Sequence, residues 1–284
     1  MGHDPIERPF GTVAVLGLGV MGGSLARALT TLAGGPRVLG WSPAADEREA
    51  ALGAGAVSEA PARWEDAVAG AELVVLAMPL RATCAMLAEV ARATPEETTL
   101  SDVASLKAPL ARAAERAGIA ARWVGAHPMA GSERSGFAAS RADLFRDARV
   151  WTAVHESAEP RLGGVHALWH AIGARPARIG WDEHDRLMSV ASHLPQLAAN
   201  ALAAVLADAG VTPDQLGPGG RDMTRLAASN PLIWRDLLSE ARPELVEGLR
   251  ALGAGAERVA DLLEAGELEA VRDLMVKTRA WRRS

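Results

Sequence analysis

The chain has 284 residues, enough for one large domain or two moderate ones with a buried core. Hydrophobic residues make up 49% and charged residues 23%, which is typical of a folded globular protein and excludes an intrinsically disordered chain. A net charge of -5 gives no overall basic field for phosphates, and no local basic patch is visible. We therefore expect no nucleic-acid partner.

Cys84 is the single cysteine, which excludes an intramolecular disulfide and a cysteine-rich metal site. We expect a reducing, cytoplasmic location and no metal. Residues 1–10 carry charges and lack the apolar run of a signal peptide. The sequence also has no run of about 18 uncharged apolar residues, so we predict no membrane partner.

Strand-like runs and helical segments alternate along the first part of the chain. The β-branched, apolar runs predict strands at 12–16, 37–41, 56–58, 71–78, 98–100, 122–125 and 150–154. Helical spacing is visible at 24–32 and 46–52 between them. Strands that alternate with helices indicate a parallel, doubly wound sheet.

After residue 179 the apolar residues follow helical spacing only. We predict helices at 182–209, 231–252 and 256–278, and a flexible loop at 217–220, whose sequence is GPGG. The first of these helices has a wider apolar face than one isolated helix can bury. We therefore expect this region to pack against a second subunit, which makes a homodimer the predicted assembly.

Gly17, Gly19 and Gly22 form the pattern G-x-G-x-x-G between the first predicted strand and the first predicted helix. In this context the first glycine permits a tight turn, the second lets the backbone approach a pyrophosphate, and the third lets helix and strand pack closely. The pattern predicts a dinucleotide cofactor. The fold class is thus α/β: a Rossmann-type, doubly wound, mostly parallel sheet over residues 1–179, followed by an all-α substrate and dimerisation domain over 180–284.

Ser42 follows the second predicted strand, where an acidic residue usually binds the ribose 2′-hydroxyl of NAD. A serine hydrogen-bonds either a 2′-hydroxyl or a 2′-phosphate. Arg48 is the nearest downstream arginine, and we interpret it as a solvated helix residue. The choice between NAD and NADP stays open. The predicted cofactor contacts are Gly17, Gly19, Val20, Met21, Gly22, Ser42 and Pro79.

Two polar segments follow predicted strands, at the carboxyl edge where open α/β sheets bind ligands. The first is Ser101 to Lys107 (SDVASLK) and the second begins at His127 (HPMAGSE). A histidine before a proline lies on a turn of fixed geometry. There His127 is a candidate base, with Ser105 as a hydrogen-bonding partner that orients it.

These motifs occur with SHLP at 192–195, DMTR at 222–225 and NPLIWRD at 230–236, in an order that spans almost the whole chain. The combination resembles the prephenate dehydrogenases and their arogenate-using relatives. The resemblance implies NAD(P)-dependent oxidative decarboxylation of prephenate to 4-hydroxyphenylpyruvate in tyrosine biosynthesis. The alternative within the family is an arogenate dehydrogenase, which forms tyrosine directly.

The resemblance also implies roles for individual residues. His127 is the base at the ring hydroxyl and Ser105 its partner. Arg225 binds the side-chain carboxylate of the substrate, for which a planar guanidinium is well suited. Glu133 corresponds to an acidic residue at the pocket entrance.

On the predicted helix 182–209, His193, Gln196 and Asn200 lie three and four residues apart and form a polar stripe. We predict that His193 and Gln196 bind the substrate. Many relatives have a second histidine at the position of Gln196. His184 lies nine residues before His193, on the opposite face of a straight helix, so we interpret it as structural.

Two other functions are compatible with a nucleotide-binding domain. The β-hydroxyacid dehydrogenases use a lysine of the interdomain helix, but Lys107 and Lys277 are the only lysines here and Lys277 is close to the C-terminus. A non-catalytic, nucleotide-sensing regulator needs only the glycine loop. His127, Ser105 and Arg225 favour the enzyme over the regulator.

Overall fold

The computed structural model describes residues 9–131, 134–240 and 242–283. These residues form two compact units. The first extends to Asp185 and includes the later segment Ser229–Glu240; the second combines Arg186–Ala228 with 242–283. The predicted domain boundary between residues 179 and 180 stays a prediction.

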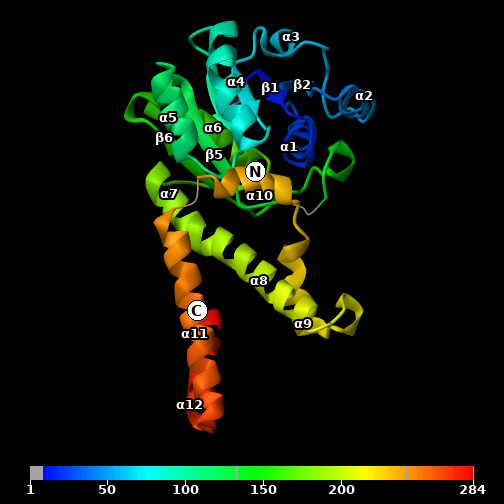
Figure 1. Ribbon diagram of the computed structural model, residues 1–284. Helices are drawn as coiled ribbons and strands as arrows, with labels where there is room; N and C mark the ends of the chain where they lie inside the picture. The colour runs from blue at the N-terminus through cyan, green and yellow to red at the C-terminus, as the bar shows by residue number, and fades with distance from the viewer. Residues whose placement is uncertain (1–8, 132–133, 241, 284) are drawn as a thin grey trace, which may run out of the picture. The chain divides into compact units, whose positions relative to one another are not determined.

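A seven-stranded sheet forms the centre of the first unit, with strand order β2-β1-β3-β4-β5-β6-β7 (Figure 1). Only β5 and β6 pair antiparallel, so the predicted mostly parallel sheet is confirmed. The strands are β1 Thr12–Leu16, β2 Arg37–Trp41, β3 Leu73–Leu76, β4 Thr99–Asp102, β5 Trp123–Pro128, β6 Arg149–Val154 and β7 Arg175–Arg178.

The core lies on both faces of the sheet. Val13 and Val15 belong to one hydrophobic cluster, whereas Ala14 and Leu16 belong to another, because successive residues of a strand point to opposite faces. Helices cover both clusters, which is why the buried residues of β1 and all residues of β3 are apolar. The α-helices of this unit are α1 Val20–Thr30, α2 Ala45–Gly53, α3 Trp64–Val68, α4 Leu80–Ala93, α5 Ala108–Arg116, α6 Glu159–Ala171 and α10 Pro231–Leu238.

Two strands differ from the sequence prediction. The predicted strand at 56–58 is reduced to one bridge between Leu39 and Glu59. The sequence pattern does not predict β7, whose sequence RPAR holds two exposed arginines and a half-buried proline. Proline is tolerated there because β7 pairs only with β6, at the edge of the sheet.

The second unit is helical, as predicted, but its helices are shorter. A π-helical turn at Ser189–His193 interrupts the predicted helix 182–209. Pro243 starts a new helix, and Gly266, at φ +72°, ends it. The predicted loop 217–220 contributes the start of a short helix. The elements are α7 Trp181–Met188, which begins in the first unit, α8 Leu194–Asp208, α9 Pro218–Thr224, α11 Pro243–Glu264 and α12 Leu268–Arg283, the last two side by side (Figure 1).

Candidate active site

The glycine loop is packed tightly on one side and open on the other. Gly17 has φ +101°, and a Cβ there would lie 2.6 Å from the carbonyl oxygen of Ala77. A Cβ on Gly22 would lie 1.8 Å from the carbonyl oxygen of Gly17. In contrast, a Cβ on Gly19 would meet nothing within 4 Å. The two outer glycines therefore hold α1 against the sheet, and the middle one leaves space for a ligand.

This open space lies at the N-terminus of α1, which begins at Val20 and has no acidic residue in its first turn. The first amides of a helix have no intrahelical acceptors, and a pyrophosphate is a suitable acceptor. Pro79 follows β3 and caps α4 at the same edge of the sheet. These residues fit a dinucleotide. The predicted contacts of Val20, Met21 and Pro79 stay predictions.

Ser42 follows β2 and is 2% exposed. Its hydroxyl donates to Glu47 Oε2 at 2.5 Å and accepts the amide of Ala44 at 3.3 Å. Arg48 donates to the carbonyl oxygen of Ser42 at 2.6 Å. The end of β2 is therefore linked by side chains to the first turn of α2.

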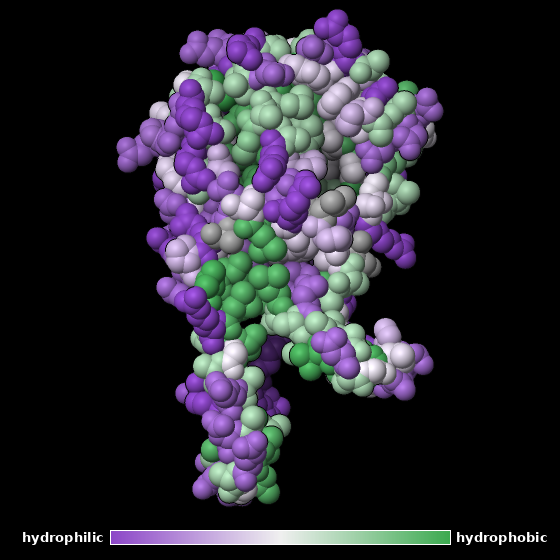
Figure 2. All heavy atoms as spheres, viewed as in Figure 1, coloured by the Kyte–Doolittle hydropathy of each residue, from purple (hydrophilic) through white to green (hydrophobic). Residues whose placement is uncertain are grey.

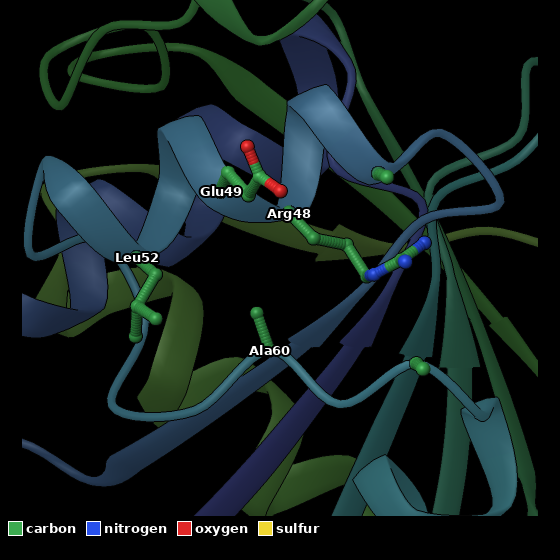
Figure 3. Close-up of a pocket in the computed structure, with 6 residues that line it drawn as sticks. Arg48, Glu49, Leu52 and Ala60 are labelled. Atoms are coloured by element: carbon green, nitrogen blue, oxygen red, sulfur yellow. The ribbon is translucent and has the colours of Figure 1, made fainter.

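A shallow pocket of about 170 Å³ lies between α2 and the segment that faces it (Figure 3). The Arg48 and Glu49 side chains point in different directions from α2 (Figure 3). The pocket is lined by Ala45, Arg48, Glu49, Leu52, Ala60 and Ala62.

His127 lies near the end of β5, as the sequence predicts, and is half-buried. Its Nδ1 atom is 2.9 Å from Nε2 of His184, and the two rings meet edge to face at 77°. His184 is fully buried. The candidate base therefore contacts a second imidazole, 57 residues further along the chain.

Asp185 extends this contact. His184 Nδ1 lies 2.7 Å from Asp185 Oδ1. The same carboxylate accepts the amides of Lys107 at 2.8 Å and Ala108 at 2.9 Å, at the N-terminus of α5. Burial alone would raise the pKa of Asp185, but the hydrogen bonds from His184 and from these two amides outweigh burial and lower the pKa. Asp185 is therefore a carboxylate at neutral pH.

An ionised carboxylate only accepts hydrogen bonds. The Asp185 carboxylate therefore determines which atom donates in its contact with His184 and in the contact of His184 with His127. His184 carries its hydrogen on Nδ1, toward Asp185, and its Nε2 becomes an acceptor. His127 then donates from Nδ1 and keeps the lone pair on its own Nε2. In this arrangement Nε2 of His127 is able to take a proton.

The buried ion pair of Lys107 and Asp102 contacts β5. Lys107 and Asp102 are both fully buried, and Lys107 Nζ donates a hydrogen bond to Asp102 Oδ1. Lys107 also donates to the carbonyl oxygen of Ala126, and Trp123 Nε1 donates to Asp102 at 3.0 Å. Burial raises the pKa of Asp102 and lowers that of Lys107, and their mutual attraction opposes both shifts. Lys107 therefore holds the residue before His127 in place.

In the second unit, His193 and Gln196 are both buried. Gln196 Nε2 donates to Asn200 Oδ1 at 2.9 Å and to the carbonyl oxygen of Leu226 at 2.7 Å. Leu226 follows Arg225, which is exposed and starts the 3₁₀ segment Arg225–Ala228. Gln196 therefore links α8 to the segment that carries Arg225.

Two family models match the chain. The nucleotide-binding domain of prephenate dehydrogenase matches residues 25–177, and its dimerization domain matches residues 181–277. The chain belongs to the prephenate dehydrogenase family. The predicted family, Rossmann-type fold, NAD(P) cofactor and dimerisation domain are thereby confirmed.

Relatives of the family match most of the chain. The prephenate dehydrogenase of Bacillus subtilis is 31% identical over 83% of this chain and 66% of its own length, so the chain spans slightly less than two thirds of that relative. The cyclohexadienyl dehydrogenase of Zymomonas mobilis is 30% identical, over 84% of this chain and 83% of the relative. The crystal structure of prephenate dehydrogenase from Aquifex aeolicus, in complex with hydroxyphenyl propionate and NAD+, has a TM-score of 0.86 and 26% identity, and the match covers 95% of this chain and 96% of that one.

In this member of the family, two predicted residues are not joined to His127 by a described contact. The Ser105 hydroxyl, expected to orient His127, makes no hydrogen bond within residues 9–131, 134–240 and 242–283. Glu133 lies outside the described residues. The roles of both stay predictions. His184, interpreted from the sequence as structural, contacts His127 instead, and its position beside Asp185 was the available signal.

Proposed function

We propose that the protein catalyses the NAD(P)-dependent oxidative decarboxylation of prephenate to 4-hydroxyphenylpyruvate, a reaction of tyrosine biosynthesis. The chain of contacts from Asp185 through His184 to His127 is the observation that carries this proposal. These contacts orient the lone pair of the His127 imidazole at the carboxyl edge of the sheet. The glycine loop lies at the same edge. Similarity to prephenate dehydrogenases along most of the chain supports the same reaction.

In the proposed reaction, the ring alcohol loses a proton and a hydride, and the ring carboxylate leaves as carbon dioxide while the ring becomes aromatic. Bound NAD(P)+ supplies the hydride acceptor. Nε2 of His127 accepts the hydroxyl proton. The resulting imidazolium is stabilised through His184 by the Asp185 carboxylate, so the positive charge forms in a site already arranged to hold it.

Substrate recognition is assigned to Arg225, His193 and Gln196 of the second unit and to Glu133. We propose that Arg225 binds the side-chain carboxylate with its planar guanidinium. His193 and Gln196 complete the substrate contacts, together with Glu133. The hydrogen bond from Gln196 to the carbonyl oxygen of Leu226 supports a further role for Gln196, namely to fix the backbone that presents Arg225.

We infer that the protein is a homodimer. Together, α7, the π-helical turn and α8 form the 28-residue helical segment Trp181–Asp208, which has a mean hydropathy of 1.3 over 18 residues and only 17% of that window buried. By length and composition alone such a segment is able to cross a membrane. It lies in the range matched by the dimerization domain, so we propose a second copy as its partner. Hydrophobic side chains are also exposed elsewhere on this unit (Figure 2), among them Met223, Leu263, Met275 and Trp281. A cytoplasmic location and the absence of nucleic-acid and membrane partners stay predictions.

Arogenate is the alternative substrate, because it has the same ring alcohol and ring carboxylate and differs in its side chain. A cyclohexadienyl dehydrogenase among the relatives keeps this alternative open. The His127 contacts favour either enzyme over a nucleotide-sensing regulator, since a sensor needs no oriented base.

Initial rates of the purified protein with prephenate or arogenate, each with NAD+ or NADP+, test the proposal. We expect growth of reduced-nicotinamide absorbance with prephenate and formation of 4-hydroxyphenylpyruvate. If arogenate is turned over faster than prephenate, arogenate is the substrate and the protein is an arogenate dehydrogenase. If no pair reacts, the dehydrogenase function is wrong.

A further inference from the structure

The end of β2 has an acidic group that the strand sequence alone does not reveal. Rossmann-type domains that bind NAD usually place an acidic residue at this strand end, where it accepts the ribose 2′-hydroxyl. Here Ser42 occupies that position, and its side chain is almost completely buried. The carboxylate of Glu47 lies 2.5 Å from the Ser42 hydroxyl. Glu47 is half-buried, so it is the more accessible member of the pair.

The hydrogen bonds of Ser42 determine what this pair offers to a ligand. A serine hydroxyl has one hydrogen to donate. Ser42 donates it to Glu47 Oε2, and its oxygen accepts the amide of Ala44. The pair of Ser42 and Glu47 therefore presents acceptors only. A ribose 2′-hydroxyl is able to donate to such a pair, whereas a 2′-phosphate brings further acceptors and negative charge.

Glu47 also lies near a second segment of the chain. Its Oε1 atom lies 3.8 Å from the position that a Cβ would take on Gly136. Gly136 has φ +79° and precedes the 3₁₀ segment Phe137–Ala139, which contacts α2. The Glu47 carboxylate therefore lies close to this segment, and its partial burial reduces screening by water, which strengthens repulsion of a second anion.

Three of the four charged residues of α2 are acidic. Asp46 and Glu47 occupy the first turn of α2, and Glu49 follows them. These carboxylates already compensate the positive end of the α2 dipole. Arg48 is the only basic residue of α2. Its Nη1 atom donates to the carbonyl oxygens of Ser42 at 2.6 Å and Pro43 at 3.4 Å, so Arg48 fixes the loop after β2.

We propose that the Glu47 carboxylate, oriented by Ser42, accepts a hydrogen bond from the ribose 2′-hydroxyl of the adenosine moiety and makes this protein select NAD over NADP. The inference rests on the dinucleotide site of the proposed function and adds a cofactor preference to it. Ser42 acts as a positioning residue, and Glu47 is the residue that contacts the ribose.

Binding of the reduced cofactors in the absence of substrate tests this inference. The dissociation constants of NADH and NADPH are measured by nicotinamide fluorescence for the full chain, for Glu47→Gln and for Glu49→Gln. Glu49→Gln is the matched control, because it removes the same charge two residues away on the same helix. Circular dichroism shows whether each variant is folded.

We expect the unaltered protein to bind NADH at least about tenfold more tightly than NADPH, since like charges in contact are strongly unfavourable. Glu47→Gln should reduce this ratio by about tenfold, mostly through tighter NADPH binding, and Glu49→Gln should change it by less than about twofold. Ser42→Ala should give an intermediate ratio, because Glu47 loses its anchor.

Equal affinity for the two cofactors, tighter NADPH binding, or an unchanged ratio in Glu47→Gln would overturn the inference, as would a protein that binds neither cofactor. The outcomes separate the two proposals. Selective NADH binding without turnover of prephenate or arogenate would support the preference and contradict the enzyme. Turnover of prephenate or arogenate that is equally efficient with both cofactors would support the enzyme and contradict the preference for NAD.

Discussion

His127 Nδ1 lies 2.9 Å from His184 Nε2, and His184 is itself fixed by Asp185. This relationship links the proposed base to the N-terminus of α5, because the Asp185 carboxylate caps that helix through two amides. The orientation of the His127 ring therefore depends on residues that need not touch the substrate. We expect substitutions along this chain of contacts to change catalysis in distinct ways.

Replacement of the proposed base should have the largest effect. We expect His127→Asn to lower kcat by about 10²- to 10⁴-fold, the usual loss when a positioned base is removed. KM should change little. His170→Asn, at an exposed position of α6, is the matched control and should retain normal turnover. Steady-state kinetics with prephenate measures both, and normal turnover by His127→Asn would assign the base elsewhere.

His184 should act through His127 as a positioning residue. His184→Asn should lower kcat by about 10- to 100-fold, as the loss of a residue that orients a metal-bound histidine does. The acid limb of the kcat/KM profile should move to lower pH, because the imidazolium form of His127 loses its stabilisation. A purely structural role would lower the amount of folded enzyme without moving that limb.

Asp185 should make stability depend on pH. Its pKa is lowered in the folded protein, so its stabilising contribution is present above the unfolded carboxyl range of about 4 and is lost as the pH falls through the lower folded value. In urea unfolding, the difference between the native protein and Asp185→Asn should be constant near neutral pH and should shrink in acid. A difference that is independent of pH down to strong acid would contradict this assignment.

The sequence predicted the nucleotide-binding half well for physical reasons. β1 and β2 were placed at their observed bounds because their apolar residues are flanked by glycines and turns. β7 was missed because an edge strand of arginine and proline has no hydrophobic pattern.

The site was predicted in part. His127 was identified from its motif, but its contact with His184 arises from tertiary packing, which no local pattern encodes. His184 and His193 lie on opposite faces only of a straight α-helix, and the π-helical turn at Ser189–His193 makes this helix irregular. The hydrogen bond from Gln196 to the carbonyl oxygen of Leu226 also depends on packing between helices.

Carboxylate recognition by Arg225 gives a prediction about binding. Arg225→Ala should chiefly raise KM for prephenate, because the carboxylate is bound equally in the ground state and in the transition state. Arg221→Ala, also exposed and one helical turn earlier, should leave KM unchanged. If both variants raise KM alike, the effect reflects overall charge and carboxylate binding is assigned elsewhere.

Substitution of the two lysines, Lys107 and Lys277, tests whether the buried pair of Lys107 and Asp102 stabilises the protein. Lys107 is fully buried against Asp102, whereas Lys277 is exposed on α12. Lys107→Met leaves the Asp102 carboxylate buried without its cation and should lower the free energy of unfolding by about 3–5 kcal/mol. Lys277→Met, the matched control, should change it by less than about 0.5 kcal/mol.

Adding Asp102→Asn to Lys107→Met should recover part of that loss, because the double variant buries no unpaired charge. The pair holds the carbonyl of Ala126, directly before His127, so turnover of Lys107→Met should also fall under conditions where it is folded. Urea unfolding and initial rates measure the two effects separately. Additive losses in the double variant would mean that Lys107 and Asp102 act independently, and that the ion pair does not support the position of His127.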